Sequence, residues 1–357
     1  MADGAAALLP SRGITVLQGD VRDIGRAAAA AEAAGFDAVW SPEFYTRSAI
    51  VTLAHLATTT STVRVGSSIA YAVGRSPLTI ATEARSLDEL SGGRLVLGLG
   101  TGTKRMMYDW HGTPSESPAL RMEELVPLLR RLWRLHEGPV SHTGRFYRVD
   151  LKPTAEVTAP VRADIPVYTA AVNDRMIETA GRVADGLMGH CLFSPGYVTE
   201  FVRPALARGA QRTGRDPAAI EVTSLVITSV SDDEEQARRE VAAQIAFYIV
   251  PSAYATVMER HGFGEATARV REAFAAGDFD GMVKRVPDEM IDTFAVAGTP
   301  AQVQAGLRRF DEVLDHVIVY PPSFRLSTER CSQVLHAAVR HAAPRTGGSA
   351  TADLSRK

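Results

Sequence analysis

The fold of this chain is decided by residues Val63 to Gly102, which read VRVGSSIAYAVGRSPLTIATEARSLDELSGGRLVLGLGTG. The stretch begins with a β-branched run, Val63 to Ile69, and ends with a second apolar run, Leu95 to Leu99; both are typical of buried strands. Between them, Pro77 suits the first turn of a helix whose apolar residues recur at helical spacing. The stretch therefore predicts a strand, a helix and a second strand, with the two strands parallel and the crossover right-handed.

The segments that follow these two strands are rich in small residues. They read SSIAY at 67–71 and GLGTG at 98–102. Small residues let a backbone approach a ligand closely, and ligands of parallel α/β folds bind at the carboxyl ends of the strands. Both segments are therefore candidate binding segments, although glycines at 98, 100 and 102 also fit a chain that simply turns there.

The same alternation of strand and helix continues on both sides of this unit. We expect further strands at 13–17, 36–40, 165–168, 186–189, 222–230 and 316–320, and helices at 23–34, 48–60, 120–136, 174–184, 195–213 and 300–310. A hairpin is expected at 140–149, around Gly144. Eight strands alternating with helices fit a (β/α)₈ barrel or a doubly wound open sheet. Residues 232–292 are helical in pattern and too long for one crossover helix, which predicts a helical insertion between strands seven and eight.

Composition and charge are those of a water-soluble globular protein. The 357 residues are 45% hydrophobic and 22% charged, and the net charge of −2 gives no basic field for nucleic acid or an anionic membrane surface. No apolar run reaches about 18 residues, and the first residues lack the pattern of a signal peptide, so a cytoplasmic location is the default expectation. We expect a flexible N-terminus at 1–12, one domain at 13–343 and a disordered tail at 344–357.

Motifs of several other enzyme classes are missing from the sequence. It contains no H-E-x-x-H metal motif, no Walker loop and no G-x-S-x-G nucleophile elbow. Two cysteines, Cys191 and Cys331, cannot build a disulfide framework or a metal site, and we expect both to be buried thiols. No metal is therefore expected.

Residues 74–102 resemble the signature of the luciferase-like monooxygenase superfamily, in its branch that uses the deazaflavin coenzyme F420; they read GRSPLTIATEARSLDELSGGRLVLGLGTG. AAEAAGFDAVWSPEF, IPVYTAAVNDRMIETAGRVADG and AGTPAQVQAGLRRF agree with it, and the likeness spans roughly residues 13–325. The resemblance implies the closed barrel, the insertion over its mouth, coenzyme F420, and hydride transfer to or from a small organic substrate. The alternatives are an FMN-dependent monooxygenase, supplied with reduced flavin by a partner reductase and using dioxygen, and a non-catalytic cofactor-binding barrel.

The resemblance also points to binding residues at four strand ends. Relatives have a non-prolyl cis peptide behind the cofactor ring, which here would be Ser68-Ile69, so Ser68, Ile69, Ala70 and Tyr71 are expected to bind the ring. Val172 and Asn173 match the turn that contacts the cofactor phosphate, although relatives often have glycines there. Gly100, Thr101 and Gly102 could face the phosphate or the ribityl chain, and His190 is placed for ligand contact.

Glu43 is the candidate for proton transfer, at a position where some relatives carry Asp-His. It could act as a general acid or base if burial raises its pKa, it could bind the ring or the substrate, or its role could be structural. Arg75 could contact an anionic cofactor tail or pair with a carboxylate. Further candidates for the pocket or its lid are His111, Tyr108, Trp110, Phe247, Tyr248 and Tyr254, whereas His55 is expected to be structural. The substrate stays open, and relatives suggest a homodimer.

Overall fold

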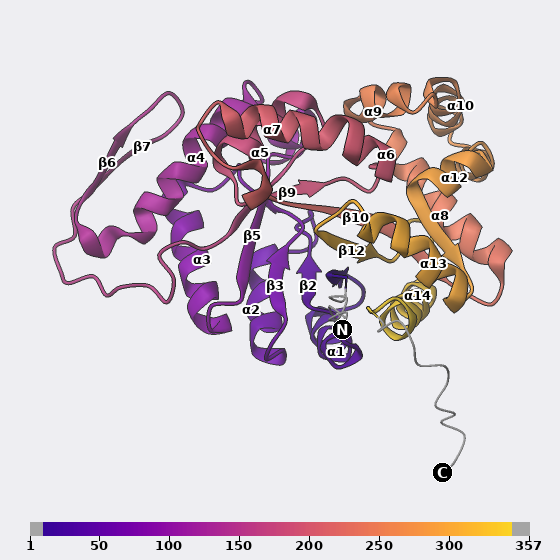
Figure 1. Cartoon of the computed structure of the whole chain (residues 1–357), viewed down its shortest axis with the longest axis horizontal. Helices are drawn as coiled ribbons and strands as arrows, with labels where there is room; N and C mark the ends of the chain where they lie inside the picture. The colour runs from indigo at the N-terminus through magenta and orange to yellow at the C-terminus, as the bar shows by residue number, and fades with distance from the viewer. Residues whose placement is uncertain (1–9, 345–357) are drawn as a thin grey trace, which may run out of the picture.

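A closed parallel barrel forms the centre of the computed structural model, which describes residues 10–344 (Figure 1). Its eight strands are β1 Arg12–Thr15, β2 Ala38–Ser41, β3 Arg64–Ser67, β5 Leu95–Gly100, β8 Val167–Ala170, β9 Gly186–Gly189, β10 Glu221–Val230 and β12 His316–Tyr320. Each pairs in parallel with its neighbours, and β10 closes the ring because it pairs with both β9 and β12. The expected (β/α)₈ barrel is confirmed, and the open sheet is excluded.

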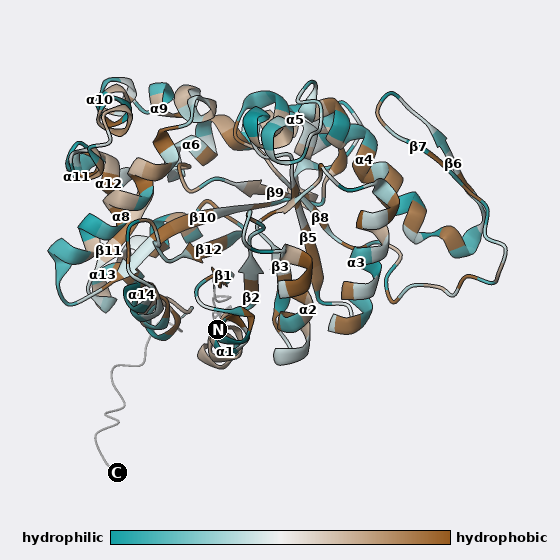
Figure 2. Cartoon of the chain, turned by 180° about the vertical axis from the view of Figure 1, so that it is seen from behind, coloured by the Kyte–Doolittle hydropathy of each residue, from teal (hydrophilic) through white to brown (hydrophobic). Residues whose placement is uncertain are grey.

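Amphipathic helices surround the barrel. They are α1 Val21–Ala34, α2 Ala49–Thr59, α3 Pro77–Ser91, α4 Pro118–Trp133, α5 Asp174–Val183, α7 Arg203–Gln211, α13 Pro300–Asp311 and α14 Thr328–His341. Helix α1 shows how the sequence sets their ends: Asp20 and Asp23 form a capping box at its start, and Gly35 ends it in the left-handed conformation. Figure 2 shows hydrophobic residues along the central strands and hydrophilic ones on outlying helices such as α10.

The expected helical insertion lies between β10 and β12. It contains α8 Glu234–Ile249, α9 Ala255–Arg260, α10 Gly264–Ala275, α11 Phe279–Lys284 and α12 Asp288–Phe294. A short ninth parallel strand, β11 Ala295–Gly298, follows it and pairs with the carboxyl half of β10. Strand β11 was not predicted from the sequence, because its four residues, AVAG, continue directly from helix α12 without a turn residue between them.

Smaller elements depart from the regular alternation. The expected hairpin is present as β6 Val140–Thr143 and β7 Arg148–Leu151, and it projects from the barrel (Figure 1). A two-residue strand, β4 Ala70–Tyr71, pairs with the end of β5. The single helix expected over 195–213 is instead α6 Pro195–Tyr197, a π-helical turn at Val198–Val202 and α7. A second π turn lies at Met106–Trp110, and 3₁₀ turns lie at Leu135–Glu137, Pro217–Ala219 and Ser252–Tyr254.

The amino end of the chain corrects one expected boundary. Residues 1–9 and 345–357, which hold most of the expected flexible N-terminus and disordered tail, lie outside the described residues. Arg12 was placed in the flexible segment, yet it opens β1 and its side chain is only 2% exposed. Its guanidinium donates to Asp311 on α13 at 3.0 Å and to the carbonyl of Ala342 at 3.1 Å. The ion pair with Asp311 therefore holds Arg12 in place, although the absence of a periodic pattern around it predicted a flexible segment.

Polar side chains close the amino end of the barrel interior. The indole N–H of Trp40 donates to Nε2 of His316 at 3.0 Å, and Ser11 lies 2.7 Å from the other ring nitrogen. Arg64 donates to Glu221 at 3.1 Å, and the Tyr168 hydroxyl donates to the same carboxylate at 2.5 Å. Asp37 joins this network through Ser11 and Arg64. The network pairs most of the buried polar groups at the end of the barrel that carries no candidate site residue, although Oγ1 of Thr223, opposite His316, has no partner.

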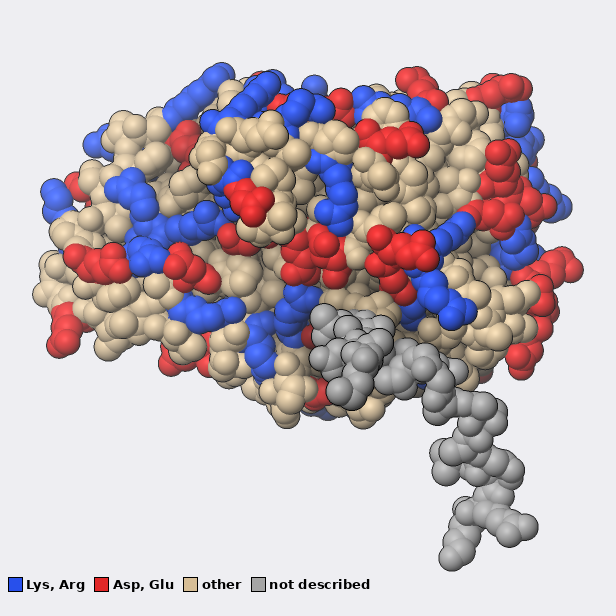
Figure 3. Space-filling model, viewed as in Figure 1, with Lys and Arg blue, Asp and Glu red and all other residues tan. Residues whose placement is uncertain are grey.

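Charges of both signs are interspersed on the molecular face seen in Figure 3. Among residues 10–344, no single helix is long and apolar enough to cross a membrane; α8 with residues 252–260 passes the length and composition test only as a pair bent by 99°.

Candidate functional site

The expected binding residues lie on neighbouring strands at the carboxyl end of the barrel. The peptide bond between Ser68 and Ile69 is cis, as the resemblance implied. This bond ends β3, and the chain then pairs with β5 through Ala70 and Tyr71. Ile69 packs against the aromatic cluster inside the barrel and also against Tyr71 and Met107. The cis segment therefore forms an apolar wall at the barrel mouth.

Glu43, just after β2, is fixed to this wall by four hydrogen bonds. Its backbone N–H donates to the Ile69 carbonyl at 2.8 Å, and its carboxylate accepts from the Tyr71 N–H at 2.8 Å. Arg75 grips the same carboxylate with both terminal nitrogens, at 2.7 and 2.5 Å. Burial by itself raises the pKa of Glu43, but the bonds from Arg75 and Tyr71 outweigh it and lower that pKa below its usual value.

Glu43 is therefore ionised at neutral pH. The raised pKa that a general acid or base would need is not found, and the alternative for Arg75, that it pairs with a carboxylate, is the one observed. The structure gives Glu43 the geometry of a clamp that holds the Tyr71 backbone and Arg75 beside the cis segment.

Gly100, at the end of β5, lets three segments meet. A Cβ atom there would collide with the side chain of Ile69 and lie 3.1 Å from that of Ala170. Thr101 is buried, and Gly102 turns the chain at φ +70° with Tyr71 beside it. Glycine is therefore needed for packing at position 100 and for backbone conformation at position 102.

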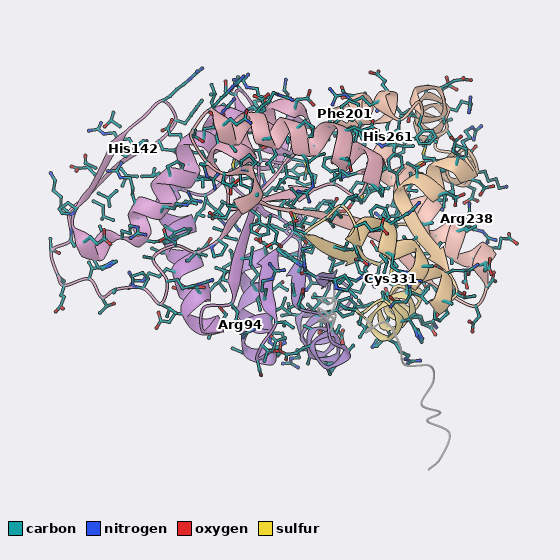
Figure 4. All side chains as sticks on the ribbon, in the orientation of Figure 1. Arg94, His142, Phe201, Arg238, His261 and Cys331 are labelled. Carbon is teal, nitrogen blue, oxygen red and sulfur yellow. The ribbon has the colours of Figure 1, made fainter. Side chains whose placement is uncertain are left out.

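Val172 and Asn173 lie where the end of β8 enters helix α5. The Asn173 side chain caps the helix by accepting from the Met176 N–H at 3.0 Å. Asp174, in the first turn, forms a two-bond ion pair with Arg260 of the insertion, at 2.8 and 2.9 Å. Arg260 also stacks on Phe201, and Figure 4 shows Phe201 near His261 where the insertion meets the barrel helices. This ion pair ties the insertion to the expected phosphate turn.

His190, one residue beyond β9, is enclosed by aromatic rings of the insertion. It stacks on Tyr254 with ring centroids 4.4 Å apart and meets the edge of Tyr248 at 4.7 Å. Tyr248 in turn shares a 3.0 Å hydrogen bond with Tyr320, the last residue of β12. Burial lowers the pKa of His190 to about 3, so its ring is neutral at pH 7. The same cause raises the pKa of the Tyr248 hydroxyl, which stays protonated.

Several buried polar atoms at these strand ends have no hydrogen-bond partner. They are Oγ1 of Thr15, Nε2 of Gln18, Oγ of Ser41 and Oγ of Ser68. Side chains alternate along a strand, so Thr15 and Ser68 lie on the same side as Gly13 and Gly66, both of which face Trp40 inside the barrel. Buried polar atoms are nearly always paired in folded proteins, so unpaired ones at a mouth fit a polar ligand edge. Together with the apolar wall at Ile69, they fit the ring of a flavin or deazaflavin.

Other candidates separate into rim and structural residues. Phe44, Tyr45 and Trp110 form an exposed aromatic cluster at the mouth, with centroids 4.2 to 5.6 Å apart. His111 stacks on Tyr71 at 4.8 Å. His55 packs against Gly25 of α1, the structural position expected for it.

Both cysteines are buried free thiols, as expected, and burial raises the pKa of Cys191 well above its usual value. Within residues 10–344 no group of three or more His, Cys, Asp or Glu side chains is arranged to hold a metal ion.

Sequence reasoning missed three residues of this site, namely Thr15, Gln18 and Tyr320. Each lies at or just after the end of a strand, so the rule that strand ends hold ligands could have found them. No motif marks them, and the strands β1 and β12 were read only as scaffold.

Comparison with known proteins agrees with this geometry. The luciferase-like monooxygenase family matches residues 4–316. A putative coenzyme F420-dependent oxidoreductase of Mycobacterium tuberculosis is 31% identical over 288 residues, covering 76% of this chain and 82% of the relative. The 5,10-methylenetetrahydromethanopterin reductase of Archaeoglobus fulgidus is 32% identical over 285 residues, covering 76% and 81%.

A solved structure extends the likeness to the fold. The coenzyme F420-dependent tetrahydromethanopterin reductase of Methanopyrus kandleri superposes with a TM-score of 0.79 at 27% identity, over 94% of this chain and 98% of that one. Family and relatives are oxidoreductases. The chain belongs to the luciferase-like monooxygenase family.

Proposed function

We propose that this protein is a coenzyme F420-dependent oxidoreductase that transfers a hydride between the deazaflavin and a small organic substrate. The observation that carries the proposal is the set of buried, unpaired hydroxyls beside the apolar cis segment at the barrel mouth. Two relatives at 31% and 32% identity, named an F420-dependent oxidoreductase and a methylenetetrahydromethanopterin reductase, support this cofactor and reaction class.

The residues present suit each part of the cofactor. Ile69, Ala70 and Gly100 offer an apolar floor for the ring, and the hydroxyls of Thr15 and Ser68 can donate to its polar edge. The turns at 100–102 and 172–173 lie on the neighbouring strands β5 and β8. Their main-chain N–H groups and the start of α5 suit an anionic phosphate.

When bound, the deazaflavin supplies a ring carbon that gives or takes the hydride. The protein has to orient that ring and hold any proton that moves with it. Glu43 serves to orient the ring, because it stays ionised and keeps Arg75 and the Tyr71 backbone in place beside the cis segment. The insertion supplies the protonated donors instead: the rings of Tyr248 and Tyr254 flank the neutral ring of His190, and the Tyr248 hydroxyl lies 3.0 Å from that of Tyr320. These aromatic side chains also exclude water from the mouth.

The alternative is a monooxygenase that uses reduced FMN and dioxygen, which the family's description favours. The two cofactors differ at the ring atom that reacts: deazaflavin carries carbon where flavin carries nitrogen. A side-by-side fluorescence titration of the full chain with coenzyme F420 and with FMN separates them. Binding of F420 at least about tenfold tighter than FMN is expected, a difference of about 1.4 kcal/mol. Preference for FMN would overturn the deazaflavin assignment. A protein that binds neither cofactor would refute both the F420-dependent and the FMN-dependent function.

A further inference from the structure

A hollow beside the candidate site contains a cation without a counter-ion. The hollow has a volume of about 250 Å³ and is lined by residues 72–75, Thr113, Arg121 and Tyr147. It begins where the cis segment ends, since Ala72 directly follows Tyr71 and Arg75 holds Glu43. Anything that occupies it can therefore be part of a molecule bound over the cis segment.

The two arginines of the hollow differ in their partners. Arg75 is neutralised by Glu43 and lies 3.3 Å from Glu83. Arg121, on α4, donates to the backbone carbonyl of Glu116 at 3.1 Å and lies over the ring of Phe146 at 4.6 Å. No carboxylate in the described part of the chain pairs with Arg121. Its positive charge thus lines a cavity uncompensated.

Neighbouring charges make this position more favourable for an anion. A second guanidinium, that of Arg145, lies 5.1 Å from the Phe146 ring. The nearby acid on α4, Glu124, is already occupied by the hairpin: it accepts from the N–H groups of Arg145, Phe146 and Tyr147 and from His142. Two cations on one ring, with the local carboxylate bound elsewhere, favour a negatively charged ligand.

A second unpaired group lies next to the hollow. Nε2 of His111 is buried and has no hydrogen-bond partner in the described structure. The His111 ring lies between Tyr71, on which it stacks, and Gly74, which lines the hollow and whose Cβ position lies 2.7 Å from the ring. Of the other polar wall residues, Thr113 donates its hydroxyl to the His111 carbonyl at 3.3 Å, and the Tyr147 hydroxyl is hydrogen-bonded to Arg121.

We propose that Arg121 binds a carboxylate or phosphate group of a ligand whose remainder lies over the Ser68–Tyr71 segment. Two sources carry that chemistry. One is the chain of glutamate carboxylates that coenzyme F420 carries beyond its phosphate, an assignment that rests on the proposed function. The other is an acid group on the substrate, which does not depend on the deazaflavin.

The test uses the full chain and a matched pair of variants on α4. Arg121→Gln removes the unpaired cation. Arg131→Gln is the control, because Arg131 lies on the same helix, is exposed and also donates to a backbone carbonyl, that of Ser141 at 2.7 Å. Arg121→Lys keeps the charge and removes the planar fork. Thermal unfolding of each variant establishes that it is folded.

Two ligands are titrated by fluorescence, F420 with its glutamate tail and the same deazaflavin phosphate without glutamates; glutarate is titrated by calorimetry. If the tail is the source, Arg121→Gln weakens the tailed form about tenfold or more and leaves the tail-free form unchanged, since a charge-assisted bond contributes about 1.5–3 kcal/mol. Raising salt from about 20 to about 200 mM narrows the difference between wild type and variant. Arg131→Gln leaves both affinities unchanged.

If the substrate is the source, Arg121→Gln leaves both deazaflavin affinities unchanged and abolishes saturable glutarate binding. A folded Arg121→Gln protein that binds all three ligands as the wild type does, or a wild type that shows neither a tail preference nor glutarate binding, would overturn the proposal and leave Arg121 as a brace for the hairpin. The glutarate arm also keeps the two claims separate: a protein that binds no deazaflavin refutes the proposed function, and glutarate still tests Arg121.

Discussion

The two ends of the barrel treat their buried polar groups differently. At the amino end, Trp40, His316, Arg64, Glu221 and Tyr168 are all joined by hydrogen bonds of 2.5 to 3.1 Å. At the carboxyl end, the hydroxyls of Thr15, Ser41 and Ser68 and the Gln18 amide nitrogen have no partner. Thr223, opposite His316 at the amino end, also has an unpaired hydroxyl, so the two ends differ in degree. The larger set of unpaired atoms lies at the carboxyl end, beside the apolar cis segment, and marks where a ligand belongs.

Hydrogen bonds also hold the helix layer at the amino end of the barrel. Arg94, between α3 and β5, donates five hydrogen bonds to α2, the turn after it and the end of α3, which secures the amino ends of the strands. Figure 4 shows Arg94 far from Phe201 and His261, which lie where the insertion meets the barrel helices. Substitutions at the amino end should therefore change stability, and those at the carboxyl end should change binding.

The largest effect is expected from Arg12→Met at the amino end. The variant leaves Asp311 buried without its cation, and breaking such a pair costs about 3–5 kcal/mol of unfolding free energy. Urea denaturation measures the loss. Arg26→Met is the matched control, because Arg26 pairs with Asp23 at an exposed site where a loss below about 1 kcal/mol is expected. If Arg12→Met instead lowered F420 affinity and left stability unchanged, the assignment of stability to the amino end and of binding to the carboxyl end would be wrong.

Glu43→Gln tests whether Glu43 supports binding or proton transfer at the carboxyl end. Because the variant releases Arg75 and the Tyr71 backbone, F420 affinity and kcat/KM should fall together by about tenfold while kcat changes little. Glu83→Gln is the control, since it leaves the bond from Arg75 to Glu43 intact. A fall in kcat of about 10² or more at unchanged affinity would instead return Glu43 to proton transfer.

The pH dependence of this variant follows from the lowered pKa of Glu43. Because the pKa of Glu43 is lower in the folded state, its ion pair contributes fully to stability above the unfolded-state pKa near 4.5. This contribution is lost as the pH falls through the lower folded-state pKa. The difference in the free energy of unfolding between the wild type and Glu43→Gln should therefore stay constant from about pH 6 to about pH 9. A step within that range would contradict the ionised clamp.

The smallest effect is expected from Glu32→Gln, again at the amino end. Glu32 accepts from the N–H groups of Ser61, Thr62 and Val63 before β3, and these bonds lower its pKa to about 2 against the opposing effect of burial. Allowing for solvent screening, it should contribute about 1 kcal/mol of stability above about pH 4.5, lost as pH falls towards about 2. Urea denaturation at several pH values measures this, and a difference that does not decline in acid would refute the assignment.

The alternation of strands and helices could be predicted because its information is local, whereas closure into a barrel was implied by the family resemblance, since an open sheet has the same alternation. Eight apolar strand runs, each followed by a helix with cap residues such as Asp20 and Gly35, are visible without any long-range contact. Strand β11 and the broken helix after Pro195 could not be predicted, because each depends on packing against a partner element: β11 is a strand only because it pairs with β10.

The sequence places its candidate residues at strand ends, and the structure gathers those strand ends at one end of the barrel. Residues 68–71 follow β3, Gly100 ends β5 and His190 follows β9, while the cis bond was implied by the family resemblance. The state of Glu43 could not be read from the sequence, because it is set by Arg75, which lies 32 residues away. The unpaired atoms of Thr15 and Ser68 likewise become visible only when every neighbour is in place.

Two adjacent serines separate a hydroxyl that is available to a ligand from one that is bonded within the protein. Ser67 donates to the Gly98 carbonyl at 2.7 Å, whereas the Ser68 hydroxyl is buried and unpaired. Titration of F420 and urea denaturation are measured on Ser67→Ala and Ser68→Ala. Ser68→Ala should weaken F420 binding about tenfold without loss of stability, and Ser67→Ala should lose about 1 kcal/mol of stability with unchanged affinity. Unchanged F420 affinity in Ser68→Ala would contradict a deazaflavin site at the carboxyl end of this barrel.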